Sequence, residues 1–189
     1  MKDKILDTAA RVFAEKSYEG ARMDEIAKLA GVPKSLIYYH FQSKEEIFKV
    51  LINRFVSGYM AIAEPHLEET HQEKAERMNS GQENLYYEFG LKNEDVVRLI
   101  FIDALKKKGG NKVFFEMIDQ MTRLESNGSD ALLHERRVAE FFTSFLPCCA
   151  YICFADGFTE YFHMERKVFD ELFMDIFNKT HGAYHKNHL

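Results

Sequence analysis

The stretch that decides the fold reads DEIAKLAGVPKSLIYYHFQSKEEIF and covers residues 24–48. Its first part, from about residue 23 to 30, spaces its apolar groups one turn apart and predicts a short helix. Gly31-Val32-Pro33 is then a tight turn, because glycine suits the left-handed residue that ends a helix and proline suits the first turn of the next. A second helix of two turns covers residues 34–41. Two short helices joined in this way predict a helix-turn-helix.

A helix on each side completes a compact head. Residues 3–16 carry the stripe of an amphipathic helix, with apolar groups at Ile5, Ala9, Val12 and Phe13. We expect Ile37 and Phe41 to face inward against this helix and Ile26. Ser43-Lys44-Glu45-Glu46 fits the S-x-x-E capping box, so a fourth helix begins there and runs to Pro65.

The outward face of the second motif helix offers groups that suit DNA. Lys34 stands at its N-terminal end, where a recognition helix meets base edges. The arc opposite Ile37 holds Ser35, Tyr38, Tyr39 and Gln42. Hydroxyls, an ammonium and aromatic rings suit phosphate oxygens and thymine methyls. The alternative is a small helical core that binds nothing, but exposed tyrosines on so short a helix favour a partner.

Residues 24–48 also resemble the signature of the tetracycline-repressor (TetR) family, which reads I-A, A-G-V, L-Y-x-x-F and S-K-E-E-L. The matching segments are Ile26-Ala27, Ala30-Gly31-Val32, Ile37-Tyr38-Tyr39-His40-Phe41 and Ser43-Lys44-Glu45-Glu46-Ile47. The resemblance covers about residues 5–50. It implies a DNA-binding transcriptional regulator, a repressor in the usual case, rather than an enzyme.

Carried over position by position, the resemblance implies base contacts near Lys34, Ser35 and Tyr38 and phosphate contacts from Tyr39, His40 and Lys44. Two positions depart from the family pattern. Ala21-Arg22 stands where a Thr/Ser pair is common, so the second helix lacks its usual hydroxyl cap and Arg22 offers a phosphate or minor-groove contact instead. Leu36 replaces a small residue or Thr and favours an apolar contact.

Beyond the head the sequence stays helical, so the expected fold class is all-α. We divide the chain into a helix-turn-helix DNA-binding domain at residues 1–46 and a helical effector-binding and dimerisation domain at residues 47–189. Helices are expected at about 66–79 and 93–108, after Asn111, after a turn at 127–130, from Pro147 (as a start or a kink) to Phe162, and at 165–179 with an end at Gly182.

The final helix predicts a homodimer. Its apolar residues repeat in pairs every four positions, at Val168, Phe169, Leu172, Phe173, Ile176 and Phe177. This arc is broader than a surface helix needs, although the chain itself could bury it. In family members the last two helices pair across a two-fold axis. The resemblance therefore implies an isologous four-helix interface and a palindromic DNA operator.

The body also offers walls for an effector pocket. The candidates are Tyr59, Phe101, Met117, Met121, Phe142 and Tyr151. Methionine adapts to variable apolar ligands, and the many aromatics suggest a hydrophobic, planar effector. The alternatives are that these residues are ordinary core, or that the body docks a partner protein instead of a small molecule.

Cysteine and histidine clusters suggest a further alternative, a metal or redox sensor. Cys148, Cys149 and Cys153 lie close together, but their apolar surroundings favour buried thiols that pack as small hydrophobes. His181, His185 and His188 have helical spacing, yet Gly182 and the chain end favour a frayed tail. We therefore expect no metal site and no cofactor.

Charge and hydropathy set the remaining limits. Residues 1–50 hold nine Lys/Arg and eight Asp/Glu, net +1, whereas the rest of the chain holds sixteen and twenty-two, net −6. DNA binding must therefore rest on the placement of individual cations. The charged start predicts no secretory signal. The longest uncharged run, residues 141–155, is short for a bilayer span, so we expect a cytoplasmic protein with no membrane partner. No catalytic motif is present, so we expect no enzyme.

Overall fold

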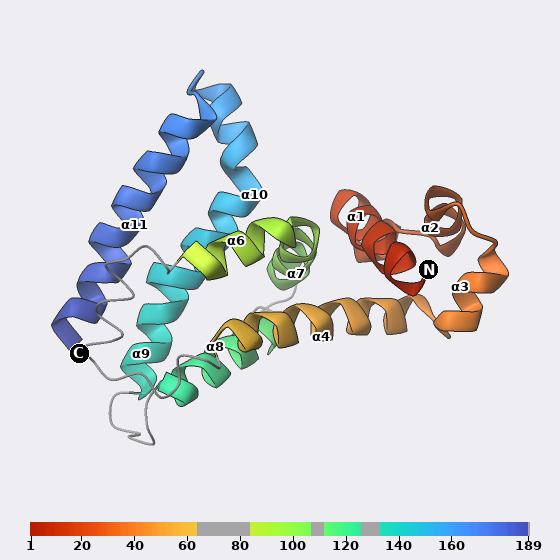
Figure 1. The fold of residues 1–189 in the computed structure, drawn as a ribbon, viewed down its shortest axis with the longest axis horizontal. Coiled ribbons are helices and arrows are strands. Elements are labelled where there is room, and N and C mark those ends of the chain that lie inside the picture. The colour runs from red at the N-terminus through yellow and green to blue at the C-terminus, as the bar shows by residue number, and fades with distance from the viewer. Residues whose placement is uncertain (64–83, 107–111, 126–132, 189) are drawn as a thin grey trace. The chain divides into compact units, whose positions relative to one another are not determined.

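The computed structural model describes residues 1–63, 84–106, 112–125 and 133–188, and every regular element in these ranges is a helix (Figure 1). The expected all-α class is confirmed. The chain forms two compact units. The first unit comprises residues 1–58 and 93–114, and the second comprises residues 59–92 and 115–189. The division after residue 46 that we expect concerns function, and it stays a prediction.

Four helices build the head of the first unit: α1 (Lys2–Gly20), α2 (Met23–Ala30), α3 (Lys34–His40) and α4 (Lys44–Ala63), whose last residues belong to the second unit. Their side chains meet in one core. The residues at its centre are at most 1% exposed and include Ile5, Phe13, Ile26, Ile37 and Phe41. The inward face predicted for α3 is therefore confirmed.

The turn between α2 and α3 depends on glycine. Gly31 has φ 64 and ψ 37, in the left-handed region, where a Cβ would cost about 1–2 kcal/mol. Its N–H donates to the carbonyl of Lys28, and the N–H of Val32 donates to the carbonyl of Ala27. These bonds satisfy the last carbonyls of α2 and fix the direction in which α3 leaves the turn.

A later helix, α7 (Glu94–Lys106), completes the first unit by packing along α1. Val97, Leu99 and Ile100 are buried on α7. At its C-terminal end, Lys106 Nζ lies 2.8 Å from Glu19 Oε2 on α1. The head is thus braced by a helix that lies far from it in the sequence.

The ion pair between Lys106 and Glu19 predicts a pH-dependent contribution to stability. The hydrogen bond from Lys106 is the main cause that lowers the pKa of Glu19 from 4.5 to about 2. A lowered carboxyl pKa stabilises the fold fully above about pH 4.5, and this stabilisation is lost as the pH falls toward 2. Because both side chains are largely exposed, we expect Lys106→Met to cost at most ~1 kcal/mol at neutral pH.

Urea unfolding of wild type and Lys106→Met, followed by circular dichroism, measures this difference in the free energy of unfolding. It should shrink steadily between pH 5 and the acid limit of the fold. A difference that grows on acidification would contradict the assignment.

The second unit contains α6 (Asn84–Lys92), most of α8 (Lys112–Glu125) and a long C-terminal hairpin. Sequence patterns did not predict α6. It lies so close to the hairpin that a Cβ on Gly90 would lie 2.7 Å from Ile152 Cδ1. The helix expected at 66–79 and the turn expected at 127–130 lie outside the described residues.

The first arm of the hairpin is one helix of 29 residues, built from α9 (Leu133–Ala139), the π-helical segment η3 (Glu140–Phe145) and α10 (Leu146–Tyr161). The wider π turns directly precede Pro147, which has no N–H and whose ring crowds the preceding turn. The helix therefore passes Pro147 without starting there. By length and composition it is apolar enough to cross a membrane, but its buried Glu140 and its packing on α11 suit the interior of a protein unit.

The second arm, α11 (Arg166–His188), continues through Gly182, so the predicted end at Gly182 and the frayed tail are wrong. The physical reason is burial of the turn that contains His181 and Gly182. His181 is 7% exposed, its Nδ1 lies 3.0 Å from Thr143 Oγ1, and its ring packs on Phe177. These contacts hold the helix in place beyond the glycine.

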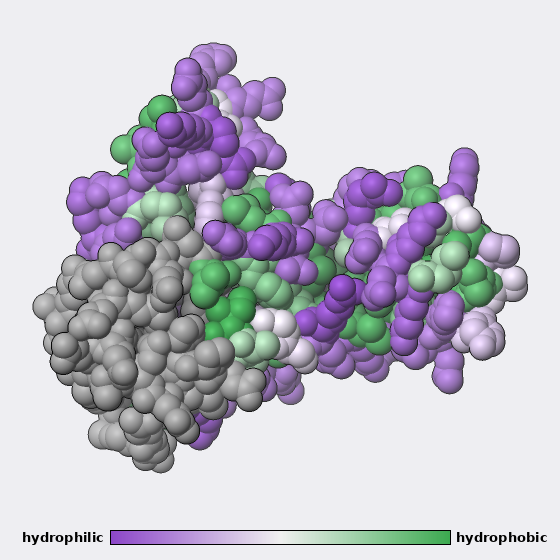
Figure 2. Space-filling view, viewed as in Figure 1, coloured by the Kyte–Doolittle hydropathy of each residue, from purple (hydrophilic) through white to green (hydrophobic). Residues whose placement is uncertain are grey.

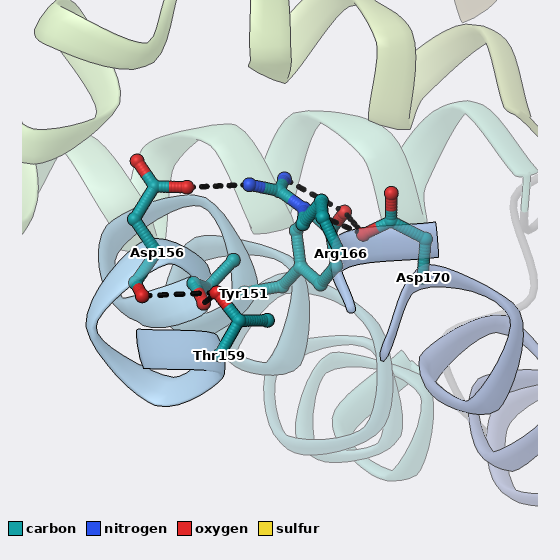
Figure 3. Close-up of polar contacts among 6 residues, drawn as sticks. Tyr151, Asp156, Thr159, Arg166 and Asp170 are labelled. Atoms are coloured by element: carbon teal, nitrogen blue, oxygen red, sulfur yellow. Dashed lines mark hydrogen bonds and ion pairs between the residues drawn. The ribbon is translucent and has the colours of Figure 1, made fainter. Parts of the chain in front are cut away.

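A polar network joins the two arms of the hairpin (Figure 3). Arg166 of α11 donates to Tyr151 Oη at 2.9 Å and to Asp170 Oδ1 at 2.7 Å. It also pairs with Asp156 of α10 at 2.5 Å, and the Tyr151 hydroxyl donates to Asp170. Burial is the main cause that raises the pKa of Tyr151. The network fixes α10 against α11, so the outer surface of the hairpin is well defined.

Candidate nucleic-acid interface

The exposed face of α3 is the centre of the candidate interface. Ile37 is fully buried, and the helical repeat therefore turns Tyr38 and Tyr39 outward, where they are 47% and 80% exposed. Ser35 is also exposed, whereas Leu36 and His40 are half-buried. The Tyr39 ring meets the His40 ring edge-on. A short helix thus presents two phenolic hydroxyls and two aromatic surfaces to solvent.

Lys34, at the start of α3, is not a free cation. Its Nζ lies 2.6 Å from Asp24 Oδ1 on α2 and 5.9 Å from the centre of the Tyr38 ring. The hydrogen bond to Asp24 raises the pKa of Lys34. The base contact from Lys34 stays a prediction. To make this contact, Lys34 has to leave Asp24, an acid that the sequence did not predict on this face.

Arg22 occupies the N-cap of α2, and no side chain caps this helix, as the missing hydroxyl pair predicts. The Arg22 side chain is exposed. It is therefore placed to reach a ligand beyond the head, and its phosphate contact stays a prediction.

Lys44 turns inward and caps α1. Its Nζ donates to the carbonyls of Tyr18 at 2.7 Å and Ala21 at 3.1 Å, and lies 4.5 Å from the centre of the Tyr18 ring. α1 needs this cap because Ser17, with φ 63, interrupts the helix and leaves carbonyls without intrahelical partners. The phosphate contact from Lys44 stays a prediction, and in this conformation its ammonium is occupied by backbone carbonyls.

The predicted capping box at the start of α4 forms in a modified way. The Glu46 N–H donates to Ser43 Oγ at 3.1 Å, and Glu46 Oε2 accepts the N–H of Gln42 at 2.6 Å. The connection from α3 to α4 is therefore held at both ends, which fixes the orientation of α3 relative to the core.

The structure divides the six apolar residues of α11 between two faces. Phe169, Phe173 and Phe177 pack inward, where Phe169 and Phe173 lie against the Tyr151 ring. Val168, Leu172 and Ile176 point outward and are 43–59% exposed. On α10 and its C-cap the exposed large apolar residues are Phe154, Phe158, Tyr161 and Phe162. Figure 2 shows hydrophobic residues among the hydrophilic ones on this hairpin. This outer stripe is where a partner helix pair would fit.

The residues predicted to line an effector pocket have different surroundings. Tyr59, Met117, Met121 and Tyr151 are buried in the second unit. Phe101 is half-buried in the first unit and packs on Phe114, and Phe142 is 62% exposed. Their role stays a prediction.

The cysteine and histidine alternatives gain no support. Cys149 is buried, which raises the pKa of its thiol and keeps it protonated. Among the described residues, no group of three His, Cys, Asp or Glu side chains is arranged to hold a metal ion. The side chains of His185 and His188 lie outside the described residues.

Comparison with known proteins supports the interpretation of the head as a helix-turn-helix. Residues 5–51 match the family of bacterial regulatory proteins described as the tetR family. Over 49 residues, the chain is 47% identical to the biofilm operon icaADBC HTH-type negative transcriptional regulator IcaR of Staphylococcus epidermidis. It is 49% identical over 49 residues to IcaR of Staphylococcus aureus strain Newman. Each match covers 26% of this chain and 26% of the relative, so only the head is compared.

Two solved structures extend the likeness over most of the chain. A transcriptional regulator of the TerR/AcrR family from Aquifex aeolicus is 25% identical with a TM-score of 0.59, over 75% of this chain and 81% of that one. A TetR-like transcriptional regulator from Rhodococcus sp. RHA1 has a TM-score of 0.62 at 17% identity, over 93% of this chain and 92% of that one. The second likeness concerns the fold alone.

Fold, motif and relatives together place residues 5–51 in the class of helix-turn-helix heads of transcription regulators. Within that class, the head is similar to that of the tetR family of bacterial regulatory proteins over residues 5–51.

Proposed function

We propose that the protein is a dimeric, cytoplasmic transcriptional repressor that binds a palindromic operator and leaves it when a small hydrophobic ligand binds the body. The observation that carries this proposal is the exposed α3 face, with Tyr38 and Tyr39 held outward by a helix-turn-helix. Two relatives similar in this head, the IcaR proteins, are named negative transcriptional regulators. Repression then follows from occupation of a promoter by the bound dimer.

Base contacts are assigned to Lys34, Ser35 and Tyr38, an apolar contact to Leu36, and phosphate contacts to Arg22, Tyr39, His40 and Lys44. Of these residues, the exposed ones can reach DNA without rearrangement of the head. Lys34 and Lys44 first have to leave Asp24 and the α1 carbonyls, which lowers their net contribution to binding.

The dimer is assigned to the outer stripe of the α10–α11 hairpin. Val168, Leu172 and Ile176 follow one face of α11 at intervals of four residues, and large exposed aromatics lie on α10. Isolated apolar residues are normal on a surface, but exposed apolar residues repeated along one helix face are typical of an interface. Pairing of two hairpins across a two-fold axis buries both copies of the stripe.

Replacing Leu172 and Ile176 together with glutamate should convert the dimer to a monomer, because four carboxylates would enter the apolar interface of each dimer. Sedimentation equilibrium at micromolar concentration measures the mass. Leu105→Glu on α7 is the matched control, since Leu105 is 71% exposed and lies outside the stripe. A wild-type protein that sediments as a monomer, or a double variant that remains a dimer, would refute the assignment.

Aromatic packing in the second unit favours an apolar effector. Tyr87, Tyr151 and Phe173 form one ring cluster between α6 and the hairpin, with Tyr87 4.9 Å from Tyr151 between ring centres. Burial is the main cause that raises the pKa of Tyr87, so this side chain stays neutral. A flat, apolar ligand matches the chemistry of these rings.

A reporter experiment tests the proposed repression. The DNA site selected by the protein is placed across a promoter, and transcription is measured with and without the protein. We expect transcription to fall several-fold when the protein is present. It should recover when a ligand that releases the protein from the operator is added. An increase in transcription would show an activator instead.

A further inference from the structure

The unpaired cations of the head lie beside α3 rather than on it. Lys34 is paired with Asp24, Lys16 with Glu25, Lys49 with Glu45, and Lys44 is occupied by carbonyls of α1. Lys2 and Lys4, in the first turn of α1, are exposed and pair with none of the carboxylates in the described part of the chain. Arg22 at the N-cap of α2 and Lys28 on α2 are exposed as well, so Lys2 and Lys4 extend the charge available to an anion beyond the family signature.

Packing of α1 brings these two ammonium groups to the two ends of α3. Lys4 Nζ lies 3.8 Å from the point where a Cβ on Gly31 would stand, at the turn that enters α3. Lys2 Nζ lies 5.3 Å from the centre of the Phe41 ring, at the residue that leaves α3. Figure 1 shows the N-terminus of the chain beside α2 and α3. The two ammonium groups thus flank the recognition helix.

We propose that Lys2 and Lys4 form an additional DNA-binding site that contacts backbone phosphates on either side of the base pairs faced by α3. A helix lying in the major groove has a phosphate strand on each side, and cations at its two ends are placed to meet them. Such contacts are independent of sequence, and each neutralised phosphate adds to the salt dependence of binding. The proposal rests on the proposed DNA-binding function and assigns the source of its electrostatic attraction.

The test measures affinity for a fluorescein-labelled duplex of mixed sequence, by polarisation, over a series of salt concentrations. Wild type is compared with Lys2→Gln/Lys4→Gln. In a plot of the logarithm of the binding constant against the logarithm of the salt concentration, each lost phosphate contact lowers the steepness of the slope by about 0.9. A dimer loses two lysines in each protomer, so the slope should become less steep by about 3–4. Affinity at ~100 mM salt should fall at least tenfold.

The matched control is Lys16→Gln/Lys49→Gln, which removes the same charge from the same unit at lysines that already hold acids. We expect its slope to remain within about 1 of wild type. Lys2→Arg/Lys4→Arg should keep the wild-type slope, and the melting temperature should be the same in all variants because these side chains are exposed.

The outcomes separate the two proposals. If wild type binds with a steep slope and Lys2→Gln/Lys4→Gln keeps that slope, or loses no more than the control, the additional site is refuted while DNA binding stands. If wild type itself shows no binding to any duplex, the proposed function fails, and the additional site fails with it.

Discussion

Replacing Tyr38 and Tyr39 together with alanine is expected to weaken operator binding severely. Each exposed tyrosine supplies a hydroxyl and a ring at the centre of the interface, and a lost contact of this kind costs roughly 1 kcal/mol or more. A dimer carries four such residues, so the affinity should fall about a thousandfold. Polarisation with a labelled operator measures the dissociation constant.

The same variant should fold normally, because neither side chain belongs to the core. Exposed substitutions usually change the free energy of unfolding by less than about 0.5 kcal/mol. Tyr38→Phe/Tyr39→Phe separates the two contributions, since it keeps the rings and removes the hydroxyls. If the alanine variant had the wild-type dissociation constant, α3 would not be the recognition helix.

Replacing Glu140 with alanine is expected to cause the largest loss of stability among the polar substitutions considered. Glu140 is 4% exposed in the π-helical segment, and its Oε2 lies 3.9 Å from Nε2 of the buried His181. Removing one partner of a buried ion pair costs about 3–5 kcal/mol, and this cost applies here when the His181 imidazole is protonated. For a chain of this size the melting temperature should fall by about 10 °C.

Two variants serve as controls for this loss. Glu171→Ala removes the same charge from an exposed position on α11 and should change the melting temperature by about 2 °C or less. Glu140→Gln keeps a polar group beside His181 and should lose less stability than Glu140→Ala. Equal melting temperatures for Glu140→Ala and Glu171→Ala would show that the pair does not stabilise the hairpin.

The head could be predicted from sequence because its determinants are local. Gly31 indicates a left-handed residue at the end of α2, and Ser43 indicates a helix cap. The spacing of Ile37 and Phe41 indicates the buried face of α3. Each of these signals spans only a few residues. The bounds of α2 and α3 follow from them directly.

The electrostatics of the interface could not be predicted in the same way. The pairing of Lys34 with Asp24 depends on how α2 and α3 cross, and the capping of α1 by Lys44 depends on the interruption at Ser17. Lys106 reaches Glu19 from a helix far along the chain. A net charge of +1 over residues 1–50 therefore does not say which cations face outward.

The structure of the body was harder to predict because it has more apolar residues than one buried face of each helix needs. On α11, six apolar residues fit either face, and only the packing of Phe173 against Tyr151 distinguishes the inner stripe from the outer one. Gly182 signals a helix end, but burial of His181 overrides it. The π turns before Pro147 leave no sequence signal beyond the proline itself.

Selection from a library of random duplex DNA tests the central claim most directly, with wild type and Tyr38→Ala/Tyr39→Ala run in parallel. We predict that wild type enriches a palindrome whose two half-sites are centred about 34–36 Å apart or a multiple of that distance, one or more helical turns of DNA, and that the variant enriches nothing. Enrichment of the same palindrome by the variant, or of no site by wild type, would contradict the claim that α3 reads DNA.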